Sequence, residues 1–82
     1  MNHEGDWVER TKRLLKAELK RQDVTYEELA RRLSAMGIAE TKASIANKIS
    51  RGGFTAAFFL ASMTAAGCKA LRFDESGAVV GI

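Results

Sequence analysis

Capping residues and glycines divide the first 67 residues of this chain into four segments whose apolar residues recur at helical spacing. Helix starts are indicated at Asp6, Thr25, Thr41 and Thr55, and helix stops at Gly37, Gly52 and Gly67. Proline, which would interrupt such segments, is absent. The sequence therefore predicts helices over about residues 6–22, 26–36, 41–51 and 55–66.

The remaining residues have the pattern of a short hairpin. Two strand-like runs, about residues 69–73 and 78–82, flank a turn with the sequence Asp-Glu-Ser-Gly. The predicted fold class is therefore mainly all-α: one domain, residues 1–82, of four compact helices with a C-terminal β-hairpin tail. An isolated hairpin is marginal in water, so the tail should lie on the helices, pair with a second chain or fray.

The third predicted helix, within TKASIANKISRG, has a thin apolar seam. Ile45 and Ile49 are its large apolar residues, and with both facing inward the other side chains point outward. Ser44, Asn47, Lys48 and Arg51 then form one stripe at i, i+3, i+4 and i+7. Such side chains read base edges or bind phosphate, and Ala43 is small enough to let the backbone approach a groove.

The basic charge is concentrated in two segments. The net charge of +3 hides an excess of Lys and Arg in residues 6–22 and again in residues 37–53. This distribution favours a polyanionic partner, although solvated surface helices show similar counts. An alternative interpretation needs no DNA: Lys42, Lys48 and Arg51 are then solvated surface charges, and Tyr26 shields the edge of the core.

Two segments resemble a known family. VTYEELARRL (residues 24–33) and IANKISRG (residues 45–52) are similar to the helix-turn-helix of lambda-repressor-like (Cro/C1, XRE-type) DNA-binding domains. In that family the first of these helices is the scaffold and the second enters the major groove. Here Ser34, Ala35 and Met36 are inserted before Gly37, so the scaffold helix is longer or the turn wider, and the insertion angle is not fixed.

The resemblance implies roles for nine residues. Backbone contacts fall to the start of the scaffold helix, groove contacts to the recognition helix, and a flanking phosphate contact to its last residue. In chain order these residues are Thr25, Tyr26, Thr41, Lys42, Ala43, Ser44, Asn47, Lys48 and Arg51.

More of the chain resembles a narrower family, the small bacterial proteins grouped as DUF6471. The shared elements are W-x-x-R-x-K-x-x-L-K from Trp7, N-K-I-S-R-G-x-F from Asn47, and an F-F-L…G-C-K ending from Phe58. This second resemblance implies no mechanism.

Several classes are disfavoured by the composition. A single His and a single Cys at opposite ends, with no zinc spacing, no paired carboxylates and no glycine-rich phosphate loop, predict no enzyme, no metal and no cofactor. No run of about 18 apolar residues and no signal-peptide layout are present, so we expect no membrane association and a cytoplasmic, nucleoid-associated location. Cys68 fits a reducing compartment.

The predicted function is sequence-specific binding of double-stranded DNA by a dimeric transcriptional regulator of bacterial or phage type. RNA polymerase or another protein is a further partner class if the protein activates. The dimer prediction comes from the nearly all-apolar segment 56–66 and the tail, with interface candidates Phe59, Met63, Leu71, Phe73, Val79 and Val80. The alternative is a protein-interaction module, antitoxin-like or a co-regulator, that works through helix 55–66.

Overall fold

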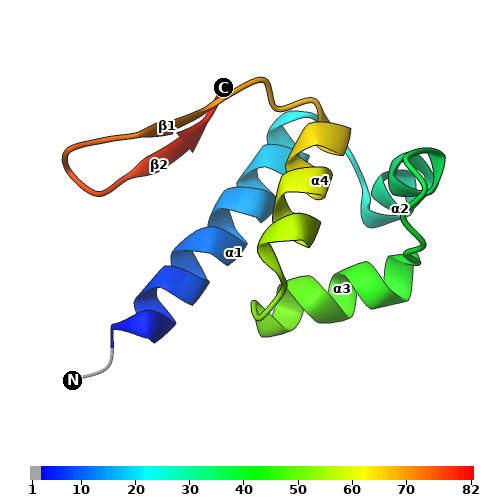
Figure 1. The fold of residues 1–82 in the computed structure, drawn as a ribbon, viewed down its shortest axis with the longest axis horizontal. Helices are drawn as coiled ribbons and strands as arrows, with labels where there is room; N and C mark the ends of the chain where they lie inside the picture. Colours follow the sequence, from blue (N-terminus) through cyan, green and yellow to red (C-terminus); the bar gives the residue numbers. More distant parts are fainter. Residues whose placement is uncertain (1–2) are drawn as a thin grey trace.

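Four helices and one hairpin make up the computed structural model, which describes residues 3–82 (Figure 1). The elements are α1 (Glu4–Arg21), α2 (Tyr26–Ala35), α3 (Lys42–Arg51), α4 (Ala56–Ala66), β1 (Leu71–Phe73) and β2 (Val79–Gly81). Helices α1 and α4 run side by side, and α3 crosses one end of the pair next to α2 (Figure 1). The hairpin extends from the other end, alongside α1. The predicted mainly helical fold with a C-terminal hairpin is confirmed.

Three threonines begin three of the helices, as predicted. The hydroxyls of Thr25, Thr41 and Thr55 each accept a hydrogen bond from the backbone N–H three residues later. Each hydroxyl therefore satisfies one of the N–H groups that the first turn of a helix leaves without a partner. The threonines precede their helices, so α3 and α4 begin at residues 42 and 56, one residue after the predicted starts.

The end of α2 fixes the path toward α3. Gly37 has a left-handed φ of 84°, and the N–H of Ile38 donates to the carbonyl of Leu33 over 2.9 Å. Residues 36–41 connect the two helices, which is longer than the turn of about three to four residues in a typical helix-turn-helix. Of the two possibilities left open by the sequence, a longer scaffold helix or a wider turn, this connection corresponds to the wider turn.

A single apolar core joins all four helices. Helices α1, α2 and α3 each supply two of its buried side chains, α4 supplies three, and the α1–α2 connection supplies one. They are Leu15, Leu19, Val24, Leu29, Leu33, Ile45, Ile49, Phe58, Met63 and Ala66. The hairpin supplies none of these ten side chains. The tail contributes only partly buried side chains at the edge of this core, among them Leu71 of β1.

The first helix differs from its prediction. It begins at Glu4 rather than Asp6, and its N-cap, His3, makes no capping hydrogen bond through its side chain. Trp7, in the first turns of this helix, is 52% exposed. The physical reason is length: 18 residues span about 27 Å, against about 16 Å for the 11 residues of α4, so the first turns of α1 extend past the core.

The strands are shorter than predicted, and they pair with each other. They are antiparallel, with Leu71 opposite Gly81 and Phe73 opposite Val79. The hairpin lies against α1 of its own chain, where the guanidinium of Arg10 donates to the carbonyl of Gly77 over 3.2 Å. Of the alternatives left open by the sequence, packing on the helices is the arrangement observed.

Candidate nucleic-acid interface

Helix α3 is held by its two isoleucines and closed at both ends. Ile45 and Ile49 are buried, at 0% and 1% exposure. At the start of the helix, Thr41 and Ser44 exchange hydrogen bonds in a reciprocal capping box. At its end, Gly52 has a φ of 72°, and its backbone N–H donates to the backbone carbonyl of Lys48. The backbone of α3 is thus fixed along its length, which a rigid recognition element requires.

Two residues of the predicted outer stripe have other partners. The Ser44 hydroxyl donates to a carboxylate oxygen of Glu40 over 2.6 Å, and the Lys48 ammonium forms an ion pair with the second oxygen. Lys48 also lies over the Phe58 ring, 4.9 Å from its centroid. Sequence reasoning placed Ser44 and Lys48 at the outer face, whereas both are half-buried and turned toward Glu40 and α4. No local pattern indicated this cluster, because Glu40 and Lys48 are eight positions apart.

The Glu40 carboxylate is ionised and almost buried. Burial raises the pKa of this carboxyl, but the hydrogen bonds from Lys48 and Ser44 and the charge of Lys48 lower it more, so the pKa lies below its ordinary value. The ion pair therefore neutralises the acidic side chain that contacts α3 through Ser44 and Lys48.

The remaining outer residues form an exposed face, which we call the α3 face: Lys42, Ala43, Asn47, Ser50 and Arg51. Among residues 3–82, the side chains of Lys42, Asn47 and Arg51 have no hydrogen-bond or ion-pair partner. Ser50 was missed by sequence reasoning, because the stripe was centred one position away. The helix contains no acidic residue, so the face combines unpaired cations with an unpaired amide.

Helix α1 brings a further cation to the end of α3. The ammonium of Lys12 donates to the backbone carbonyl of Ser50 over 3.0 Å and lies 3.5 Å from Glu9. The carbonyls at a helix C-terminus attract cations, which explains this contact. The basic side of α1 therefore meets α3 at Lys12, a contact that no local sequence pattern predicts.

A known family model covers most of this chain. The family model DUF6471, described as a domain of unknown function, matches residues 7–71. The chain belongs to the DUF6471 family. No curated protein and no solved structure matches the chain. The matched range contains all of α2, α3 and α4 and ends at the first residue of β1.

At the start of α2 in this DUF6471 domain, the side chains expected to contact the DNA backbone are already engaged within the protein. The Thr25 hydroxyl accepts from the N–H of Glu28 over 3.1 Å, so it serves as the helix cap. Tyr26 is half-buried against the core. Thr41 caps α3 in the same way. Gly52, at the C-terminus of α3, is buried against Val8 of α1.

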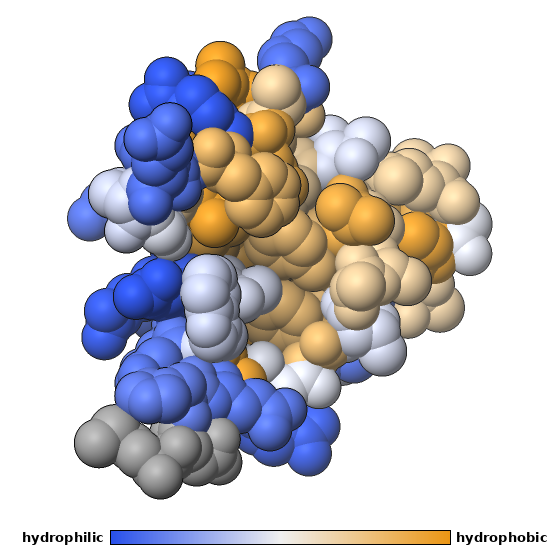
Figure 2. Space-filling view, turned by 60° about the vertical axis from the view of Figure 1, so that its left-hand side comes forward, coloured by the Kyte–Doolittle hydropathy of each residue, from blue (hydrophilic) through white to orange (hydrophobic). Residues whose placement is uncertain are grey.

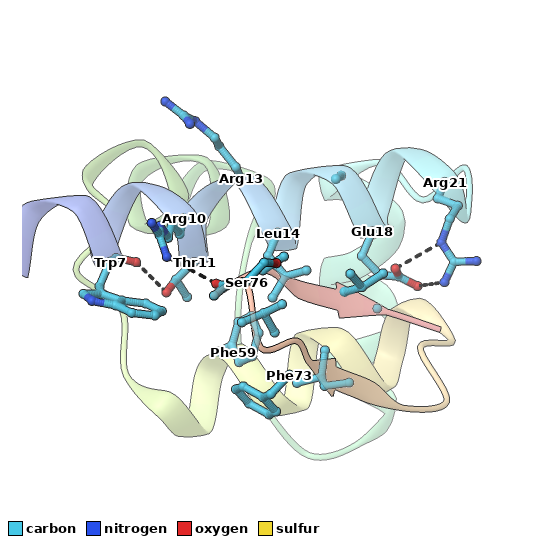
Figure 3. A pocket seen from close by; sticks show the side chains of 17 residues that line it. Trp7, Arg10, Thr11, Arg13, Leu14, Glu18, Arg21, Phe59, Phe73 and Ser76 are labelled. Carbon is cyan, nitrogen blue, oxygen red and sulfur yellow. Dashed lines mark hydrogen bonds and ion pairs between the residues drawn. The ribbon is translucent and has the colours of Figure 1, made fainter.

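The interface candidates are divided between core and surface. Met63 is 3% exposed and belongs to the core, so it is not part of any surface of this DUF6471 domain. The other five (Phe59, Leu71, Phe73, Val79 and Val80) line one groove between α1, α4 and the hairpin (Figure 3). Leu60, the most exposed residue of α4 among its large apolar side chains, lies outside that lining at 56% exposure.

Among residues 3–82, no three His, Cys, Asp or Glu side chains come close enough together to hold a metal ion. Within the same residues, none of the helices has both the length and the apolar character needed to span a bilayer.

Proposed function

We propose that this protein binds double-stranded DNA in a sequence-specific manner, with α3 inserted in the major groove. The observation that carries the proposal is the α3 face. There Lys42, Asn47 and Arg51 are exposed on a helix fixed at both ends and have no hydrogen-bond or ion-pair partner among residues 3–82. The nearest acid, Glu40, is neutralised by Lys48. Unpaired cations and amides cost little in water and become useful when they meet phosphates and base edges.

Each side chain of the α3 face suits one kind of contact. Asn47, near the middle of α3, has the geometry to pair with the Hoogsteen edge of adenine. Lys42 and Arg51 lie at the two ends of the helix, where they fit guanine acceptors or phosphates. Ala43 lets the helix approach closely. Ser44 and Lys48 are reassigned: they hold Glu40 and thereby position α3 rather than touch DNA.

The helix-turn-helix assignment forms part of the same proposal. Helices α2 and α3 pack against each other, and Thr25 caps the first of them, as in lambda-repressor-like domains. The connection over residues 36–41 is longer than in the short-turn version. A regulator of this type acts as a dimer on two half-sites about 34–36 Å apart, because one module makes few base contacts.

The test is fluorescence anisotropy with a labelled random-sequence duplex at several salt concentrations. The variant Lys42→Ala/Asn47→Ala/Arg51→Ala should bind more weakly, and the slope of log affinity against log salt should fall by about two, one for each cation removed. The matched control, Lys69→Ala/Arg72→Ala, removes two exposed cations at the opposite end of the molecule and should retain the slope (Figure 1).

Two results would contradict the proposal. One is the absence of binding at low salt by protein whose circular dichroism shows folded helices. The other is an equal loss of slope in the control, which would indicate a general charge effect. If binding passes both tests, selection from a random duplex library shows whether a preferred sequence exists, and Asn47→Ala should relax one position in it.

A second candidate function, a protein-interaction module, is favoured by a different observation. The groove between α1, α4 and the hairpin exposes aromatic side chains that a DNA-binding role does not use. The two functions are compatible, because the groove and the α3 face lie on different parts of the molecule.

A further inference from the structure

A wide groove separates the hairpin from the helices. It encloses about 740 Å³, and we call it the α1–hairpin groove (Figure 3). One wall is α1 from Trp7 to Arg21, the other is the hairpin from Leu71 to Gly81, and Phe59 of α4 lies at the base. In the space-filling view, apolar side chains form a continuous, hollowed band with hydrophilic side chains along one border (Figure 2).

The groove is lined by large apolar side chains that the core does not need. Phe73 is 76% exposed and Trp7 is 52% exposed, although both line the groove. Aliphatic residues surround these aromatic rings: Leu14, Ala17, Leu71, Val79 and Val80. A contiguous apolar hollow of this kind on a small protein marks an interaction site more often than a solvated surface.

The free charges of the groove are all positive. Arg10, Arg13 and Arg21 line it against one acid, Glu18, which gives a net charge of +2. Glu18 is 3% exposed and is paired with Arg21, its carboxylate 2.6 Å from the guanidinium. Arg10 lies over the Trp7 ring, 4.7 Å from its centroid. An occupant therefore meets apolar rings beside guanidinium groups and no unpaired carboxylate.

We propose that the α1–hairpin groove binds an acidic amphipathic helix from another protein. Such a helix places apolar side chains at i, i+3, i+4 and i+7 on one side and carboxylates along its borders. The first set fits the rings of Trp7, Phe59 and Phe73, and the second fits the arginines. The α1 wall from Trp7 to Arg21 is about 21 Å long, which corresponds to a partner helix of about four turns.

A second copy of this chain fits less well, because its own helices have the wrong charge. Helix α1 is basic, α3 has no acid, α4 has no charged residue, and the glutamates of α2 accompany Arg31 and Arg32. A flat anionic membrane cannot enter a hollow that the hairpin overhangs. Single-stranded nucleic acid would stack on the aromatic rings, but the aliphatic residues of the lining offer nothing to a base.

The fluorescence of Trp7 gives a direct readout, since this is the only tryptophan of the chain. The probe is a synthetic peptide of about 16 residues with leucines at the helical spacing and glutamates elsewhere. Titration should shift the Trp7 emission to the blue with micromolar affinity, and a scrambled peptide of the same composition should leave it unchanged. Higher salt should weaken binding.

Two pairs of variants separate the groove from the rest of the surface. Phe73→Ser should weaken peptide binding at least about tenfold, whereas Leu60→Ser, at an exposed apolar site outside the groove, should not change it. Arg10→Gln/Arg13→Gln should weaken it several-fold, and Lys16→Gln/Lys20→Gln, which removes the same charge from α1 outside the lining, should not. Circular dichroism checks that each variant is folded.

Each other result overturns the proposal in a recognisable way. Equal binding of the scrambled peptide would mean that only charge matters. Sedimentation equilibrium showing a dimer that Phe73→Ser dissociates would assign the groove to a second copy. A Trp7 shift with phosphatidylserine vesicles or oligo(dT), but not with the peptide, would assign it to a lipid surface or to single-stranded nucleic acid. None of these readouts depends on duplex binding by α3.

Discussion

At the residue scale, Glu40 decides which side chains of α3 remain free. Its carboxylate holds Ser44 and Lys48, so only Lys42, Asn47, Ser50 and Arg51 stay available at the α3 face beside Ala43. Because this carboxyl has a lowered pKa, it stabilises the fold above its unfolded pKa of about 4.5, and the contribution is lost as the pH falls through the lower folded value.

Glu40→Gln should therefore lower the free energy of unfolding at pH 7 by about 1–2 kcal/mol, because Lys48 loses its buried partner charge. The difference from wild type should shrink as the pH falls below about 4.5, where the unfolded carboxyl takes up a proton, and should vanish below the lower folded pKa. Urea melts at pH 7 and pH 3 measure both quantities. Glu27→Gln, an exposed acid without such a cluster, should change stability by less than about 0.5 kcal/mol at either pH. A pH-independent loss in Glu40→Gln would show that the charge is not responsible.

At the element scale, short sequence signals predict where the helices begin and end, but they do not predict which residues the helices contact in the folded protein. The threonine caps and left-handed glycines act within a few residues, so the ends of α2, α3 and α4 could be predicted to within one residue from the sequence. The overhang of α1 could not, because it depends on how far the neighbouring helices extend. The Glu40–Lys48 pair and the Lys12–Ser50 contact join residues whose proximity only the tertiary packing creates.

The junction of α1 and α3 illustrates such a contact. Gly52 combines a left-handed φ of 72° with a position where an added Cβ would lie 2.7 Å from a methyl carbon of Val8. Gly52→Ala should therefore cost about 2 kcal/mol of stability, from backbone strain and from displacement of α1. Gly53→Ala is the matched control: an added Cβ there meets no atom within 4 Å, so thermal melts should show a change of less than about 0.5 kcal/mol. Equal effects at both glycines would contradict the packing argument.

At the scale of the whole molecule, the two proposed surfaces belong to parts of unequal stability. The α3 face rests on a core built only from the helices and their connection, whereas the α1–hairpin groove depends on a two-stranded hairpin docked on α1. Two-stranded hairpins are marginal by themselves. The hairpin should thus open more readily than the helices, and the groove should be the more adaptable of the two surfaces.

Gly81→Ala tests this division. An added Cβ would lie 2.5 Å from the carboxylate of Glu18 and 3.3 Å from the sulfur of Cys68, so either the strand or the Glu18 side chain must shift, and the contact between the hairpin and α1 is loosened. We expect faster amide exchange in residues 69–82 and a change in Trp7 emission, while circular dichroism of the helices and duplex binding remain close to wild type, because the hairpin supplies no core residue. Gly5→Ala, where an added Cβ meets nothing, should leave hairpin exchange unchanged. If Gly81→Ala instead unfolds the helices, the hairpin is an integral part of the fold, and the groove is as rigid as the α3 face.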